Sequence, residues 1–134
     1  MASLMSVEGI GKVYTAKLAD AGLKTTDALL AAGATPKDRA ALAEKTGIDG
    51  DLILRWVNLV DLFRIRGIGE EYSDLLEAAG VDTVPELARR NPGNLYAKMV
   101  EVNQEKRKVR RLPTEAQVAD WIDQAKQLDR KISY

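Results

Sequence analysis

Apolar residues recur at intervals of three and four along most of this chain, the spacing that places side chains on one face of an α-helix. One such stripe comprises Ile53, Trp56, Val57, Val60 and Phe63. Another comprises Val13, Tyr14, Lys17, Leu18 and Ala21. No stretch alternates apolar and polar residues for long enough to predict a β-strand. The pattern therefore predicts an all-α protein made of short helices.

Threonine, aspartate and glycine mark where these helices begin and end. Thr35 places a capping hydroxyl directly before Pro36, a residue suited to the first helical position. Thr114 and Gln117 have the spacing of a capping box. Further helix starts are predicted at Thr25 or Thr26, at Asp49 or Asp51, and at Thr83. Helix ends are predicted at Gly22, Gly33, Gly47 and Gly80.

A Gly-Ile-Gly sequence occurs twice, at Gly9-Ile10-Gly11 and at Gly67-Ile68-Gly69. At this offset of 58, nine positions in the first half are identical to their counterparts: Gly9, Ile10, Gly11, Tyr14, Leu18, Ala21, Gly22, Thr25 and Leu29. Trp56 and Trp121 form a later pair at an offset of 65. Such self-similarity is the signature of an internal repeat. We therefore expect one compact domain, 1–134, that contains two pseudo-symmetric units of four to five helices, about 4–63 and about 64–130.

The growing offset predicts an eight-residue insertion in the second unit, near 103–113, and this insertion is basic. The chain as a whole is neutral, with 20 basic and 20 acidic residues. Residues 89–111 contain eight basic and two acidic residues, a net charge of +6, so the remainder carries −6. A neutral total is untypical of a strongly cationic nucleic-acid protein. The local segregation nevertheless leaves a segment that attracts anions.

Composition excludes several kinds of chemistry. The chain has no cysteine and no histidine, which excludes disulfides, thiolate nucleophiles, Cys- or His-based zinc sites and imidazole acid–base catalysis. The carboxylates Glu70, Glu71 and Asp74 lack a partner base, nucleophile or metal-ligand set, and no Walker-type loop is present. No apolar run approaches the ~18 residues of a membrane span. We therefore expect a cytoplasmic protein that is not an enzyme, needs no cofactor or metal and has no membrane partner.

The two glycine turns resemble the helix-hairpin-helix motif, in which an apolar-Gly-apolar-Gly turn joins two helices. Thr15 and Ser73 occupy the small-residue position four after the second glycine, where alanine is commoner. This resemblance implies a turn that binds a DNA backbone phosphate without reading base sequence. From about residue 6 to 128 the chain also resembles an uncharacterised bacterial family of unknown function. That likeness is carried by the paired turns and by Trp56-Val57-Asn58 and Asp61-Leu62-Phe63-Arg64.

The two turns differ in the charge around them. Lys12 and Lys17 follow the first turn and favour an anion, although Glu8 precedes it. Three carboxylates follow the second turn, at Glu70, Glu71 and Asp74. These acids suit the helix dipole but repel phosphate. We expect Gly67, Ile68 and Gly69 to form a structural hairpin, whereas structural and phosphate-binding interpretations remain equally open for the first turn.

Two hypotheses follow. The leading hypothesis is a non-enzymatic helix-hairpin-helix module that binds DNA without sequence preference. Its predicted binding residues are Gly9, Ile10, Gly11, Lys12 and Lys17 of the first hairpin, with Lys106, Arg107, Lys108, Arg110 and Arg111 of the basic run. The alternative is a protein-interaction or self-assembly scaffold that has lost nucleic-acid binding, because a +6 segment and a −6 remainder attract each other. A basic run is also typical of a solvated face or a flexible loop.

Overall fold

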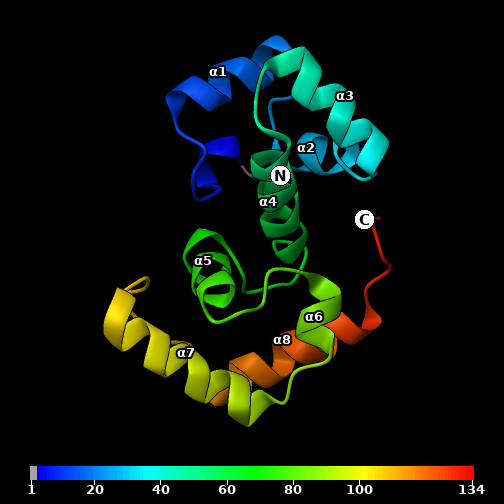
Figure 1. Ribbon diagram of the computed structural model, residues 1–134. Helices are drawn as coiled ribbons and strands as arrows, with labels where there is room; N and C mark the ends of the chain where they lie inside the picture. The colour runs from blue at the N-terminus through cyan, green and yellow to red at the C-terminus, as the bar shows by residue number, and fades with distance from the viewer. Residues whose placement is uncertain (1–2) are drawn as a thin grey trace. The chain divides into compact units, whose positions relative to one another are not determined.

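The computed structural model describes residues 3–134, and its regular elements are helices, as predicted. The elements, shown in Figure 1, are η1 (Leu4–Ser6), α1 (Lys12–Asp20), α2 (Thr26–Ala32), α3 (Pro36–Thr46), α4 (Gly50–Leu62), α5 (Glu70–Ala78), α6 (Val84–Ala88), α7 (Pro92–Lys106) and α8 (Glu115–Gln127). Across the described residues there is no named strand, so the all-α prediction is confirmed.

The chain divides into two compact units. The first contains the described residues up to Asp61 together with Arg130–Tyr134, and the second is Leu62–Asp129. The predicted repeat units, about 4–63 and about 64–130, concern homology and internal symmetry, and they stay a prediction.

The predicted threonine caps are present. Thr25, Thr35, Thr83 and Thr114 each accept a hydrogen bond, at 3.1 Å, from the backbone N–H three residues later. Gln117 also accepts from the N–H of Thr114 at 2.8 Å, which completes the predicted capping box. Asp49 caps α4 by accepting from the N–H of Asp51 at 2.9 Å. Local side-chain chemistry therefore determines where most of these helices begin.

Helix α4 contributes several buried residues to the core of the first unit. Ile53, Trp56 and Val57 are fully buried there, as the apolar stripe predicts, whereas Phe63 follows the helix and is half-buried. The stripe predicted for α1 is only partly correct, because Val13 is 67% exposed while Leu18 is fully buried. In an α-helix these two residues lie about 140° apart around the axis, so they cannot face the same core.

The second unit packs α8 against α6 and α7, and α7 against α5. The fully buried side chains of this core include Leu75, Leu76, Leu87, Met99 and Val118. Each such side chain contributes about 1.5–3 kcal/mol of burial free energy.

The five C-terminal residues belong to the first unit. The N–H of Ser133 donates to the carbonyl of Ala34 at 2.8 Å. Arg39, which is only 7% exposed, donates to the carbonyl of Ser133 at 2.8 Å and so binds the segment from inside the unit. Tyr134 donates from its hydroxyl to Asn58 at 2.8 Å. Arg130–Tyr134 is thus an integral part of the first core.

Candidate functional site

The first hairpin turns at Gly9, whose φ of +93° is a left-handed conformation that other residues adopt with strain. Ile10 is only 4% exposed, and its N–H donates to the carbonyl of Val7 at 3.0 Å. Gly9 and Gly11 are both exposed. The buried side chain of Ile10 therefore anchors the turn in the core, and the two glycines lie on its exposed surface.

The hairpin leads directly into the N-terminus of α1. Gly11 is the N-cap residue, and no side chain caps the helix there. A Cβ atom built on Gly11 would have no neighbour within 4 Å, so a side chain at this position would meet open space. Lys12, the first helical residue, is exposed, and the first turn contains no acidic residue. Uncapped N–H groups and the helix dipole give such an end a partial positive charge.

A buried tryptophan supports this turn. A Cβ atom on Gly9 would lie 3.2 Å from the indole Nε1 of Trp56, so the glycine permits a close approach. Tyr14 of α1 packs edge-on against Trp56, with ring centroids 4.9 Å apart and an interplanar angle of 63°. These contacts fix the hairpin on α4.

The second hairpin has the same internal construction. Gly67 has a φ of +102°, and a Cβ atom there would lie 2.8 Å from Nε1 of Trp121. Ile68 is 5% exposed, and Tyr72 packs on Trp121 with ring centroids 5.2 Å apart. Gly69 is an uncapped N-cap, like Gly11 in the first unit. The first turn of α5 differs from that of α1 because it carries two glutamates, Glu70 and Glu71.

The backbone of the residue directly before the hairpin glycine, Glu8 or Arg66, is held by a different side chain in each unit. In the first unit, Nη1 of Arg55 donates to the carbonyl of Glu8 at 3.1 Å. Arg55 was not predicted from the sequence. Its position directly before Trp56, the tryptophan that supports the hairpin, is the signal that could have identified it.

In the second unit an amide replaces the guanidinium. Oε1 of Gln124 accepts from the N–H of Arg66 at 2.9 Å, and Nε2 donates to the Arg66 carbonyl at 3.1 Å. The same Nε2 donates to Asp120 at 2.9 Å. Here a carboxylate, Asp120, directly precedes the tryptophan. The two hairpins therefore have similar backbone conformations at Gly9 and Gly67, whereas the residue before the supporting tryptophan is basic in the first unit and acidic in the second.

The basic run forms an ordered turn at the end of α7. Arg107 has a φ of +50° and ends the helix. Val109 is 6% exposed, and the side chain of Asn103 binds both its N–H, at 3.0 Å, and its carbonyl, at 3.2 Å. Tyr72 donates from its hydroxyl to the carbonyl of Arg111 at 3.0 Å. These contacts fix the backbone of the run at Val109 and at Arg111.

Four predicted binding residues of this run are exposed, and one is engaged in an ion pair. The exposed residues are Lys106, Arg107, Arg110 and Arg111. Lys108 instead lies 3.4 Å from the carboxylate of Asp74, which is buried in α5. This pair neutralises one of the three acids that follow the second hairpin.

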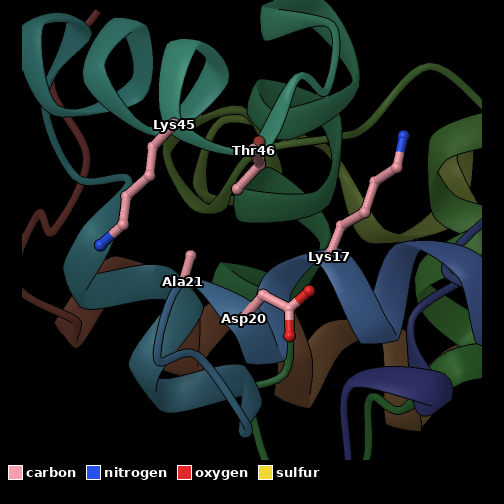
Figure 2. Close-up of a pocket in the computed structure, with 5 residues that line it drawn as sticks. All are labelled: Lys17, Asp20, Ala21, Lys45 and Thr46. Carbon is pink, nitrogen blue, oxygen red and sulfur yellow. The ribbon is translucent and has the colours of Figure 1, made fainter.

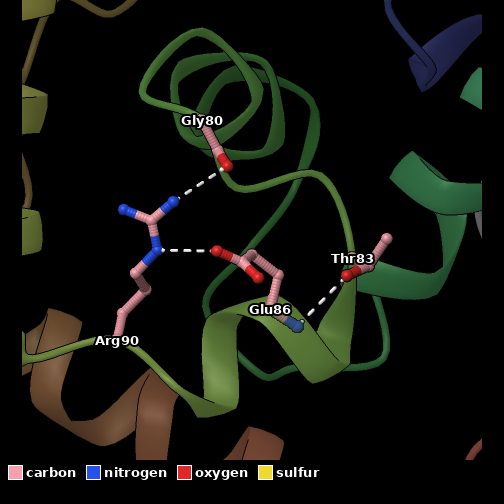
Figure 3. Close-up of polar contacts among 4 residues, drawn as sticks. All are labelled: Gly80, Thr83, Glu86 and Arg90. Atoms are coloured by element: carbon pink, nitrogen blue, oxygen red, sulfur yellow. Dashed lines mark hydrogen bonds and ion pairs between the residues drawn. The ribbon is translucent and has the colours of Figure 1, made fainter.

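Other basic residues of the +6 segment also contact acids. Arg90 donates from Nε to Glu86 at 3.0 Å and from Nη2 to the carbonyl of Gly80 at 3.1 Å (Figure 3). Thr83 caps the same short helix, so this arrangement fixes α6 at the end of α5. Lys98 lies 3.9 Å from Glu101. Glu101 is already counted in the +6, so it is the pairs of Arg90 with Glu86 and of Lys108 with Asp74 that make the outward-facing charge of the segment smaller than its sequence total.

Lys17 lies apart from the hairpin turn. Its ammonium lies 5.9 Å from the centroid of the Tyr14 ring. Together with Asp20, Ala21, Lys45 and Thr46 it lines a shallow hollow of about 200 Å³ between α1 and α3. In Figure 2 the side chains of Lys17 and Lys45 extend away from each other. They do not converge on a single anion in this hollow.

Neither an acidic metal-binding cluster nor a membrane-spanning helix is found within residues 3–134. No group of three or more acidic side chains is placed to hold a metal ion in this part of the chain. None of the helices described there combines the length and apolar character needed to cross a membrane.

Comparison with known families gives one match. The model of the family described as Domain of unknown function (DUF4332) matches residues 8–128. This match confirms the predicted resemblance to a family of unknown function, whereas the helix-hairpin-helix assignment stays a prediction. No curated protein and no solved structure matches the chain.

Proposed function

The chain belongs to the DUF4332 family, and we propose that it is a non-enzymatic, tandem helix-hairpin-helix module that binds the phosphate backbone of DNA without sequence preference. The observation that supports this proposal best is the first hairpin. There an uncapped helix N-terminus follows two exposed glycines and carries Lys12 in its first turn.

A phosphate oxygen suits this arrangement physically. Backbone N–H groups at a helix start bind anions because they lack helical partners and lie at the positive end of the dipole. Each hydrogen bond to a charged group contributes about 1.5–3 kcal/mol. The contact of Gly9 with Trp56 holds the turn in place before a ligand arrives, so little conformational entropy is lost on binding.

The basic run would add affinity without adding base specificity. Its four exposed cations are held on an ordered turn, and contacts of this kind release counterions from DNA. The second hairpin would remain structural, because Glu70 and Glu71 lie where a phosphate would approach.

Fluorescence anisotropy with short labelled duplexes of several unrelated sequences tests the proposal. We expect similar affinities for all of them and a linear fall of log affinity with log salt between about 50 and 200 mM. Lys106→Gln, Arg107→Gln, Arg110→Gln and Arg111→Gln, combined in one variant, should reduce the slope. Absence of binding at low salt would reject the DNA proposal.

The second candidate function is a protein-interaction or self-assembly scaffold. It is favoured by exposed apolar side chains in the first unit, among them Val13 at 67% and Met5 at 48% exposure. Light scattering distinguishes the candidates, since a scaffold forms a larger, concentration-dependent species in the absence of DNA. A Val13→Ser variant should weaken that species.

A further inference from the structure

We infer that Arg107 is retained at the left-handed end of α7 for its side chain, as a phosphate-contacting residue, although glycine would make this helix end more stable. The inference rests on the proposed function. It deepens that function by distinguishing one residue of the basic run from the others and by assigning a conformational cost to its contact with DNA.

The backbone at Arg107 has a conformation that glycine adopts most easily. Its φ of +50° and ψ of +48° lie in the left-handed region, where the Cβ atom of any other residue is crowded by the following carbonyl oxygen. Within residues 3–134, the other positions with positive φ are all glycine: Gly9, Gly22, Gly47, Gly67 and Gly80. Arg107 is therefore the exception among the described left-handed residues.

The first unit ends a helix in the same way with a glycine. Gly47 follows α3 with a φ of +73°, and its N–H donates to the carbonyl of Ala43 at 2.9 Å. The N–H of Arg107 makes the equivalent bond to the carbonyl of Asn103, also at 2.9 Å. Both bonds use main-chain atoms alone, so this helix end does not require an arginine side chain.

The helix dipole does not account for the arginine either. A cation stabilises the C-terminal end of a helix, but Lys106 already places one in the last turn of α7. The side chain of Arg107 is exposed, and within residues 3–134 no hydrogen bond or ion pair joins its guanidinium to another group. Strained backbone positions are concentrated at sites that bind ligands. The free guanidinium is therefore the feature for which this position is suited.

A DNA phosphate matches the side chain that the turn exposes. The guanidinium has five N–H donors in a planar fork that fits the oxygens of a phosphate. The backbone two positions later is fixed, because Asn103 binds both the N–H and the carbonyl of Val109. Three further exposed cations lie within four positions of Arg107: Lys106, Arg110 and Arg111. Together they attract a nucleic-acid backbone without reading its bases.

Two variants separate the side chain from the backbone. Arg107→Gly removes the guanidinium and relieves the conformation, whereas Arg107→Ala removes the guanidinium and keeps the unfavourable φ. In the anisotropy assay with a fluorescein-labelled duplex, both should bind about threefold to tenfold more weakly than wild type, with a salt slope smaller by about one. In thermal unfolding, the midpoint of Arg107→Gly should be no lower than that of wild type and about 2–5 °C above that of Arg107→Ala.

Gly47→Ala and Lys126→Gln are the matched controls. Gly47→Ala gives alanine a φ of +73° where its Cβ meets no atom within 4 Å, so the midpoint should fall by about 2–5 °C while affinity for the duplex stays the same. Lys126→Gln removes one exposed charge from the last turn of α8, and it should change affinity less than about twofold.

Three outcomes overturn the inference while the DNA proposal stands. The first is unchanged affinity in both Arg107 variants, and the second is a midpoint for Arg107→Gly below that of wild type, which would give the arginine a structural role. The third is an equal loss of affinity in Lys126→Gln, which would mean that net charge alone matters. A wild-type protein that binds no duplex rejects the proposed function itself.

Discussion

The hairpin glycine of each unit, Gly9 or Gly67, lies against the indole nitrogen of a buried tryptophan. Beside the first glycine lies the guanidinium of Arg55, whereas in the second unit the carboxylate of Asp120 contacts the amide that holds the turn. The backbone conformation is therefore independent of the charge around it. A glycine turn of this kind indicates how the chain folds, and only its neighbouring side chains indicate whether it can bind an anion.

The largest expected effect concerns the feature that both hairpins share. Gly67→Ala forces a side chain into a conformation with φ of +102° and places Cβ 2.8 Å from the Trp121 nitrogen. We expect the free energy of unfolding to fall by about 2–4 kcal/mol in urea denaturation. Gly9→Ala should cost less, because one of its two close neighbours is the flexible end of Arg55.

Gly69→Ala is the matched control for this prediction. Its Cβ would meet no atom within 4 Å, and its φ is −125°. The expected loss is below about 1 kcal/mol, from weaker N-capping alone. Equal losses at positions 67 and 69 would show that contact with the indole is not the reason for glycine.

A smaller effect is expected at the basic turn that follows α7. Asn103→Ala removes both side-chain hydrogen bonds to the backbone of Val109. We expect the free energy of unfolding to fall by about 1–2 kcal/mol. Hydrogen exchange should be faster at the Val109 amide than in the wild type. Unchanged exchange would mean that burial of Val109 suffices to order the turn.

Removing the charge of Lys12, in the first turn of α1, tests directly whether the first hairpin binds phosphate. Lys12→Gln should weaken binding to duplex DNA by about threefold to tenfold, since one exposed phosphate contact is lost. Anisotropy at a fixed low salt concentration measures the change. The thermal unfolding midpoint should stay the same, because Lys12 is exposed. A stability loss without an affinity loss would contradict the assignment.

The smallest effect is expected at the second hairpin. Glu70→Gln and Glu71→Gln together remove the acids from the first turn of α5. Affinity for DNA should rise by less than about threefold, because exposed charges are screened. Unfolding should become easier by a few tenths of a kcal/mol, since the helix dipole loses its favourable charges. A large gain in affinity would show that the two hairpins differ only in these glutamates.

Local chemistry made much of the fold predictable from the sequence. Threonine caps, glycine stops and the apolar stripe of α4 depend on residues within a few positions of one another, and these predictions are confirmed. Val13 was wrongly predicted to lie on the buried face of α1, because all residues at three- and four-residue steps were assigned to that face. The spacing of apolar residues alone does not show which residues at the margin of an apolar helix face are buried.

The side chains around the candidate site were less predictable, because they come together over long stretches of sequence. Arg55 reaches Glu8 across 47 positions, and Arg39 reaches Ser133 across 94. The pairing of Lys108 with Asp74 likewise joins two segments that carry no common motif. Such contacts depend on tertiary packing, which neither hydrophobic period nor residue spacing encodes.

The return of Arg130–Tyr134 to the first unit has a consequence for how the protein is made. The second unit, Leu62–Asp129, interrupts the first in the chain. A ribosome therefore synthesises all of it before Arg130–Tyr134, the segment that returns to the first unit. Until then Arg39 lacks the carbonyl of Ser133 and Asn58 lacks the hydroxyl of Tyr134. The residues before Leu62 therefore cannot complete the first unit by themselves, and a chain cut after Asp129 would lack both of these contacts.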